Sequence, residues 1–159
     1  MLKRRPFLLA ALAALAAPFA ARAHHGWSSF DQDRPLFLQG RVVASKWRNP
    51  HAELVVELPA GYRLPADLAT RAVPAQAANI DGKALLAKAV APTRKDRRWE
   101  VELGPLTQLE AWRMAPVQVG ATIGVLGYTF KDEKGEAVLR AEYVYVDGKA
   151  YALRSAPAG

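Results

Sequence analysis

Hydrophobic and polar residues alternate along several short segments of the chain, which is the pattern of half-buried β-strands. The alternation predicts five main strands and a short sixth, over residues 35–48, 51–58, 99–103, 119–130, 137–146 and 150–153. Asn49-Pro50 and Asp147-Gly148 are turn sequences between strands. The pattern therefore predicts a mainly β protein.

A short helix is expected between the third and fourth strands. Thr107 and Glu110 have the spacing of a capping box, in which each side chain bonds the other residue's backbone N–H, and the helix should reach Met114. Five strands with this helix follow the order of an OB-like barrel, a five-stranded Greek key. A β-sandwich of similar size is the competing architecture.

Residues 59–97 interrupt the strand pattern. They contain four prolines, many alanines and the start of a basic run over 94–98, and a helix is expected only around residues 84–90. We predict a partly ordered insertion within one domain over residues 24–154, followed by a disordered tail over 155–159. The basic run is typical of a solvated surface.

The first 23 residues have the composition of a signal peptide. Lys3-Arg4-Arg5 precede an apolar run over residues 6–20, and Ala21-Arg22-Ala23 is a small-x-small cleavage site. The apolar run is shorter than the roughly 20 residues that cross a bilayer, so we expect no transmembrane anchor after cleavage. The prediction is export to the periplasm, by the Sec or the twin-arginine route.

The overall composition narrows the possible functions. A chain of 159 residues suits a single domain. The absence of cysteine excludes disulfide scaffolds and zinc fingers. Removal of the leader lowers the net charge from +7 to +3, which argues against a nucleic-acid partner. No Ser-His-Asp order, catalytic carboxylate pair or phosphate-binding glycine loop is present, so we do not expect a hydrolytic enzyme.

All three histidines lie within 28 residues. After cleavage at Ala23, His24 would be the first residue, and its α-amine and Nδ1 can chelate one metal ion. His51, on the outward side of its strand, would supply a third nitrogen and complete a histidine brace. A nitrogen-rich tetragonal site favours Cu(II), and the amine, with a pKa of about 8, loses its proton to the metal near neutral pH. His25 is a further candidate ligand, or faces the opposite way.

Other residues near the histidines are candidates to support the site. Asp31 would orient a ligating imidazole or cap a loop. The remaining candidates beside the metal ligands are Trp27, Trp47 and Asn49, of which the tryptophans could equally pack in the core. Cleavage after Ala21 would instead place His24 third and give a square-planar amine–amide–imidazole site.

Several motifs carry a resemblance to a known family. They are the His24-His25 opening, the Phe30-Asp31 pair, the strand Gly40-Arg41-Val42 and the turn Trp47-Arg48-Asn49-Pro50-His51. Over residues 24–60 and 98–148 the chain resembles a family of small exported bacterial proteins of unknown function. It differs in Gly26, where serine is usual, and in the insertion. The resemblance implies export and a fold, without a mechanism.

Two functions follow from these patterns. The first is a periplasmic metal-binding protein, with copper as the expected ion, that acts in metal carriage or buffering. The second is a non-catalytic OB-type binding module for a small ligand, an envelope polymer or a partner protein, in which the histidines are structural and hold turns by hydrogen bonds to the backbone.

Overall fold

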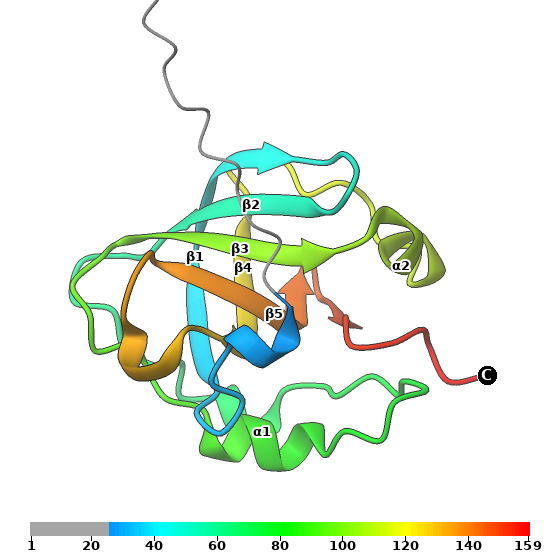
Figure 1. Cartoon of the computed structure of the whole chain (residues 1–159), viewed down its shortest axis with the longest axis horizontal. Helices are drawn as coiled ribbons and strands as arrows, with labels where there is room; N and C mark the ends of the chain where they lie inside the picture. Colours follow the sequence, from blue (N-terminus) through cyan, green and yellow to red (C-terminus); the bar gives the residue numbers. More distant parts are fainter. Residues whose placement is uncertain (1–25) are drawn as a thin grey trace, which may run out of the picture.

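The computed structural model describes residues 26–159 (Figure 1). Its strands are β1 (Leu36–Lys46), β2 (Ala52–Glu57), β3 (Arg98–Gly104), β4 (Thr122–Tyr128), β5 (Val138–Val146) and β6 (Lys149–Ala152). Its α-helices are α1 (Gly82–Lys88) and α2 (Leu106–Ala111), with short 3-10 turns η1 (Trp27–Ser29), η2 (Leu68–Thr70) and η3 (Lys131–Glu133). The predicted signal peptide, His24 and His25 lie outside the described residues.

Five strands form a closed barrel. Neighbouring strands follow the order β3-β2-β1-β4-β5, and β5 also pairs with β3, in parallel, through Glu100↔Val138, Val101↔Leu139 and Glu102↔Arg140. The sixth strand, β6, adds to β5 in antiparallel orientation. With α2 between β3 and β4, this arrangement confirms the predicted mainly β, five-stranded OB-like barrel.

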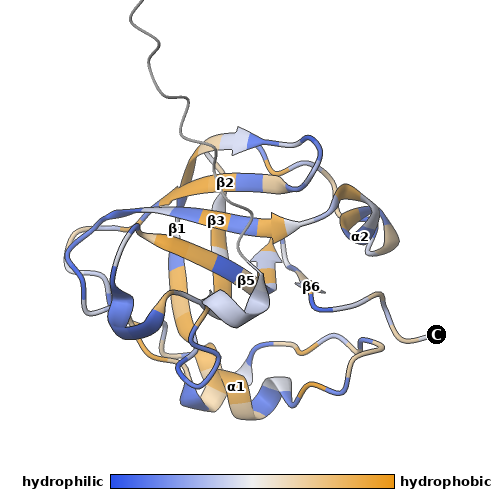
Figure 2. Cartoon of the chain, viewed as in Figure 1, coloured by the Kyte–Doolittle hydropathy of each residue, from blue (hydrophilic) through white to orange (hydrophobic). Residues whose placement is uncertain are grey.

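The alternation seen in the sequence places one side of each strand inside the barrel. Along β2, Ala52, Leu54 and Val56 are fully or almost fully buried, whereas the residues between them are partly exposed. Trp99 of β3 is completely buried in the same core. Figure 2 shows the hydrophobic positions concentrated on the barrel strands. Burial of these apolar surfaces is the main stabilising contribution to the barrel.

The long first strand takes part in both halves of the barrel. Its residues 36–41 pair with β4, and residues 41–46 pair with β2, with a register shift between Val42 and Ala44. A Cβ on Gly40 would collide with the backbone carbonyl of Glu57. Glycine therefore permits the close approach of β1 and β2 at this position.

The insertion packs on the outer surface of the barrel and builds a second core. Leu68 of η2 and Leu86 of α1 lie against Phe37, Leu126 and Tyr143 of the barrel strands. Figure 1 shows α1 beneath the barrel. Residues 75–77 also form backbone hydrogen bonds with residues 156–158, which we had predicted as a disordered tail.

The boundaries of α2 and β4 differ from the sequence prediction. The capping box at Thr107 is wrong: α2 starts at Leu106 after the N-cap Pro105, which places Thr107 inside the first turn, and no side chain caps the helix. The helix stops before Met114 because Arg113 adopts a positive φ of 50°. Strand β4 starts at Thr122 rather than Val119, because Gly120, with a φ of 96°, turns the chain just before it.

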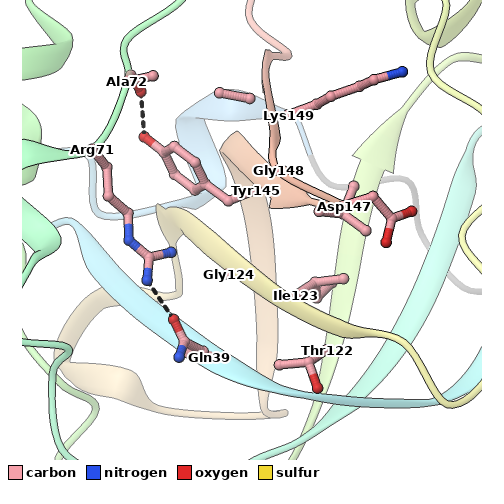
Figure 3. A pocket seen from close by; sticks show the side chains of 12 residues that line it. Gln39, Arg71, Ala72, Thr122, Ile123, Gly124, Tyr145, Asp147, Gly148 and Lys149 are labelled. Atoms are coloured by element: carbon pink, nitrogen blue, oxygen red, sulfur yellow. Dashed lines mark hydrogen bonds between the residues drawn. The ribbon is translucent and has the colours of Figure 1, made fainter.

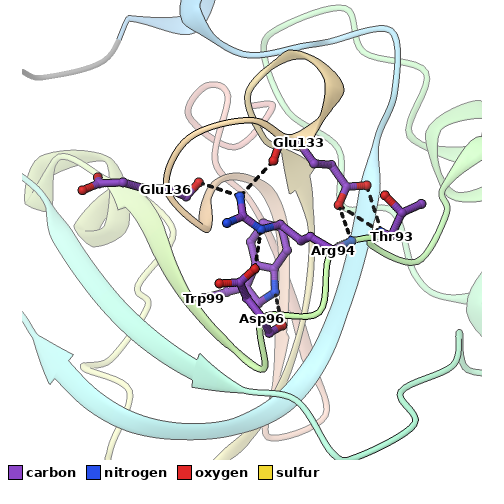
Figure 4. A network of polar contacts seen from close by, with 6 residues as sticks. All are labelled: Thr93, Arg94, Asp96, Trp99, Glu133 and Glu136. Atoms are coloured by element: carbon purple, nitrogen blue, oxygen red, sulfur yellow. Dashed lines mark hydrogen bonds and ion pairs between the residues drawn. The ribbon is translucent and has the colours of Figure 1, made fainter.

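A polar network fastens the β4–β5 connection to the insertion (Figure 4). The buried carboxylate of Glu133 accepts hydrogen bonds from the backbone N–H groups of Thr93 and Arg94, each at 3.0 Å, and from the guanidinium of Arg34. The Arg94 side chain in turn donates to the Glu133 carbonyl at 2.9 Å and lies 5.5 Å from the centre of the Trp99 ring. These contacts hold three separate segments together.

Within residues 26–159, none of the helices has both the length and the apolar character needed to cross a membrane.

Candidate metal site

His51 stands where the β1–β2 turn enters β2. It follows a cis peptide bond between Asn49 and Pro50, and its side chain is 17% exposed. It precedes the buried Ala52 and lies on the same outward side of the strand as Glu53. The Nδ1 atom of His51 lies 3.5 Å from Oε1 of Glu53. Glu53 therefore provides a carboxylate beside one nitrogen of the imidazole.

Four charged residues, which we call the charged row, cross the outer face of the barrel from this point. The register pairs Lys46 of β1 with Glu53 of β2, Glu53 with Glu102 of β3, and Glu102 with Arg140 of β5. Lys46 Nζ donates to Glu53 Oε2 at 2.8 Å. Arg140 donates to Glu102 Oε2 from Nε at 2.8 Å and from Nη2 at 2.6 Å. The two carboxylates are thus balanced by one cation at each end.

The first described residues pack at the Arg140 end of the charged row. The Arg140 guanidinium lies 5.4 Å from the centre of the Trp27 ring and 5.2 Å from that of Phe30. The Arg154 guanidinium lies 3.7 Å from the centre of the Trp27 ring. The Asp31 amide donates to the carbonyl of Thr129 at 2.8 Å. These cation–π and backbone contacts fix the segment from Trp27 to Asp31 on the barrel.

The candidate neighbours of the site have distinct positions. Trp47 packs, partly buried, against the barrel core, and Asn49 is exposed in the β1–β2 turn. Trp27 stacks with the two arginines described above. The Asp31 carboxylate accepts the Asp33 amide at 3.2 Å, which is a loop-capping contact. The sequence analysis did not select Glu53, although its place two residues after His51 on an outward strand face was a usable signal.

The described part of the chain offers few metal donors in one place. Among residues 26–159, no group of three or more His, Cys, Asp or Glu side chains is arranged to hold a metal ion. His51 with Glu53 could contribute one imidazole and a carboxylate that orients it. His24 and His25, the other predicted ligands, lie outside the described residues.

Comparisons with known proteins give one similarity. No curated protein and no solved structure matches the chain. A family model matches about a third of the 159 residues, and the matched span contains all three histidines. Over residues 11–63 the chain is therefore similar to a family of unknown function (DUF6152).

Proposed function

We propose that the mature protein binds one Cu(II) ion through His24 and His51 and carries or buffers that ion in the periplasm. His24 supplies its α-amine and one ring nitrogen, and His51 supplies the third nitrogen. The observation that carries the proposal is the charged row, because it links His51 to the place where the N-terminal segment is anchored.

The spacing of the strands supports this assignment. Glu53 on β2 and Arg140 on β5 are separated by one intervening strand, β3, and two interstrand spacings amount to about 10 Å. Trp27 is anchored over Arg140. His24 precedes Trp27 by three residues, and three extended residues span up to about 10 Å. The anchor at Trp27 thus leaves enough chain for His24 to reach Glu53, whose carboxylate lies 3.5 Å from the His51 ring.

The chemistry around His51 also suits a ligating imidazole. Histidines that bind metals commonly donate their second ring N–H to a carboxylate, which fixes the tautomer and the ring orientation. The Nδ1 atom of His51 faces Glu53, so Nε2 is the nitrogen assigned to the metal. Lys46 and Arg140 already pair with the two glutamates of the charged row, so we assign the nitrogens as the metal ligands. Nitrogen ligands favour Cu(II) over cations that prefer oxygen ligands.

The test is a Cu(II) titration of protein whose mature N-terminus has been checked by intact mass. Competition with a chelator of known affinity gives the Kd, and electron paramagnetic resonance counts the nitrogen ligands. We expect His51→Ala, or one additional alanine before His24, to weaken Cu(II) binding at least about tenfold, since each removes a ligand or breaks the chelate.

Arg48→Gln is the matched control, because it alters an exposed residue of the same β1–β2 connection and keeps every histidine and every candidate site residue. It should bind Cu(II) like the unmodified protein. Equal affinity in all four proteins would refute the proposal. A mature chain beginning at Arg22 would refute the brace as well, and His51→Ala would then leave Cu(II) affinity unchanged.

A further inference from the structure

A cavity of about 380 Å³ lies between the insertion and the outer face of β1, β4 and β5 (Figure 3). It belongs to the size range of small-molecule sites. Gln39, Gly124 and Tyr145 line it from the barrel, and Arg71, just after η2, lines it from the insertion. This cavity shares no lining residue with the charged row or with His51.

The Arg71 side chain is held rigidly at the wall of the cavity. Its guanidinium lies 5.0 Å from the centre of the Phe37 ring and 5.3 Å from that of Tyr145. The Tyr145 hydroxyl donates to the carbonyl of Ala72 at 3.0 Å and thereby ties the ring to the insertion. An arginine fixed in this way loses little conformational entropy when it binds a ligand.

The positive charge of Arg71 is only weakly compensated. Its Nη2 donates to Oε1 of Gln39, a neutral amide, at 2.6 Å. The Asp67 carboxylate lies 3.5 Å away with its side chain 67% exposed, and exposed ion pairs of this kind contribute little. Among the hydrogen bonds within residues 26–159, the Arg71 side chain donates only through Nη2. Its Nη1 donor is available to a ligand.

Gly124 makes the room for this arrangement. A Cβ at position 124 would lie 2.6 Å from Nη1 of Arg71 and 2.8 Å from Cζ of Phe37. Glycine inside a strand weakens the strand and often marks the close approach of another group. Here it lets the guanidinium lie directly on β4, with Nη1 above the part of the strand that lines the cavity (Figure 3).

We propose that this cavity binds the carboxylate or phosphate group of a small organic anion, paired with Nη1 of Arg71, with the carbon frame of the anion beside the Tyr145 ring. Arginine suits this task because its N–H groups form charge-assisted hydrogen bonds with oxyanions. The two other charged residues of the cavity, Asp147 and Lys149, point away from Arg71 in Figure 3 and have opposite signs.

The first experiment titrates the ¹⁵N-labelled protein with benzoate, phenyl phosphate and the neutral amide benzamide, followed by NMR. We expect saturable shifts of the Gly124 and Tyr145 amides and of the Arg71 Nε–H with at least one anion and none with benzamide. The two anions distinguish a carboxylate site from a phosphate site. Equal shifts with benzamide, or no saturation by about 20 mM of either anion, would overturn the proposal, because a built site should reach a millimolar Kd.

The second experiment compensates the positive charge of Arg71 and leaves its side chain in place. Gln39→Glu keeps the size of the side chain and places a carboxylate beside Nη2, so it should weaken anion binding about tenfold, which is the scale of one lost charge-assisted hydrogen bond. Arg41→Gln is the control, since Arg41 lines a neighbouring depression that shares Gln39 and Thr122 with the cavity. It should change the Kd less than twofold.

Thermal unfolding and Cu(II) affinity should be unchanged in both variants, which shows that the fold is intact. Binding by Gln39→Glu at the unmodified affinity would contradict the role of Arg71. An equal loss in Arg41→Gln would show a general effect of surface charge, and the proposal would fail.

Discussion

A single buried carboxylate, that of Glu133, holds together segments that are far apart in the sequence. Burial acts to raise its pKa, but hydrogen bonds from the Thr93 and Arg94 amides and from Arg34 outweigh burial and hold the pKa below the usual value for glutamate. The charged form is therefore favoured in the folded state. The resulting stability is present above the usual glutamate pKa and is lost as the pH falls through the lowered pKa of the folded protein.

Glu133→Gln tests this contact. At pH 7 the variant should unfold with a free energy lower by about 1–3 kcal/mol, because buried N–H donors lose their charged acceptor. The difference should shrink as the pH falls below 4.5, the reference pKa of glutamate. Urea denaturation at several pH values measures both effects.

Glu136→Gln is the matched control for that series. Glu136 belongs to the same network, but only its backbone carbonyl accepts from Arg94, so its variant should stay within about 0.5 kcal/mol of the unmodified protein. A pH-independent difference for Glu133→Gln would contradict the assigned role of its charge.

The orientation of a single side chain could be predicted from the sequence only where the alternation of a strand determines it. The outward position of His51 follows from the alternation of β2 and could be predicted. The contact between Arg34, before β1, and Glu133, between β4 and β5, joins residues that are 99 positions apart, and no local pattern encodes it. The same reason hid Arg71, whose partners Gln39, Phe37 and Tyr145 come from the distant strands β1 and β5.

At the scale of elements, the strands and helix α1 were predictable, and the packing of the insertion on the barrel was not. Strands β2 and β3 direct every second residue into the barrel core, which leaves a clear mark on the sequence. The helices of the insertion attach through isolated side chains such as Leu68 and Leu86, too few to produce a period. Helix α2 was located correctly, but its N-cap is Pro105 and not a capping-box residue, because proline already sets the backbone there.

Helix α1 depends on its N-cap more than a longer helix would. Asp81 accepts a hydrogen bond from the Ala84 amide at 2.9 Å, in a helix of seven residues. Asp81→Ala should lower the free energy of unfolding by about 0.5–2 kcal/mol. Asp67→Ala is the control, since Asp67 precedes η2 without a side-chain capping bond and should have a much smaller effect. Equal losses in chemical denaturation would contradict a specific role of the cap.

At the scale of the whole molecule, the two largest of the three hydrophobic clusters within residues 26–159 differ in importance. One fills the barrel. The other joins the insertion to the outer surface of the barrel through Phe37, Leu126 and Tyr143. Only the first core receives side chains from all five barrel strands. The insertion can therefore open while the barrel stays closed.

Native-state hydrogen exchange tests this hierarchy. Amides of β2, β3 and β5 should exchange only through global unfolding, whereas α1 amides should exchange through a smaller opening with weaker dependence on denaturant. Identical free energies and denaturant slopes for α1 and the barrel strands would show instead that the two cores unfold together.

Because β5 pairs with β3 as well as with β4, the barrel cannot close until β5 has been synthesised. Synthesis proceeds from the N-terminus, so β1 to β4 are complete before the strand that closes the barrel. Until residues 138–146 follow, β3 and β4 each present an unsatisfied edge, which is the feature that promotes intermolecular strand pairing. A nascent chain halted before β5 is accordingly the species most in need of a chaperone.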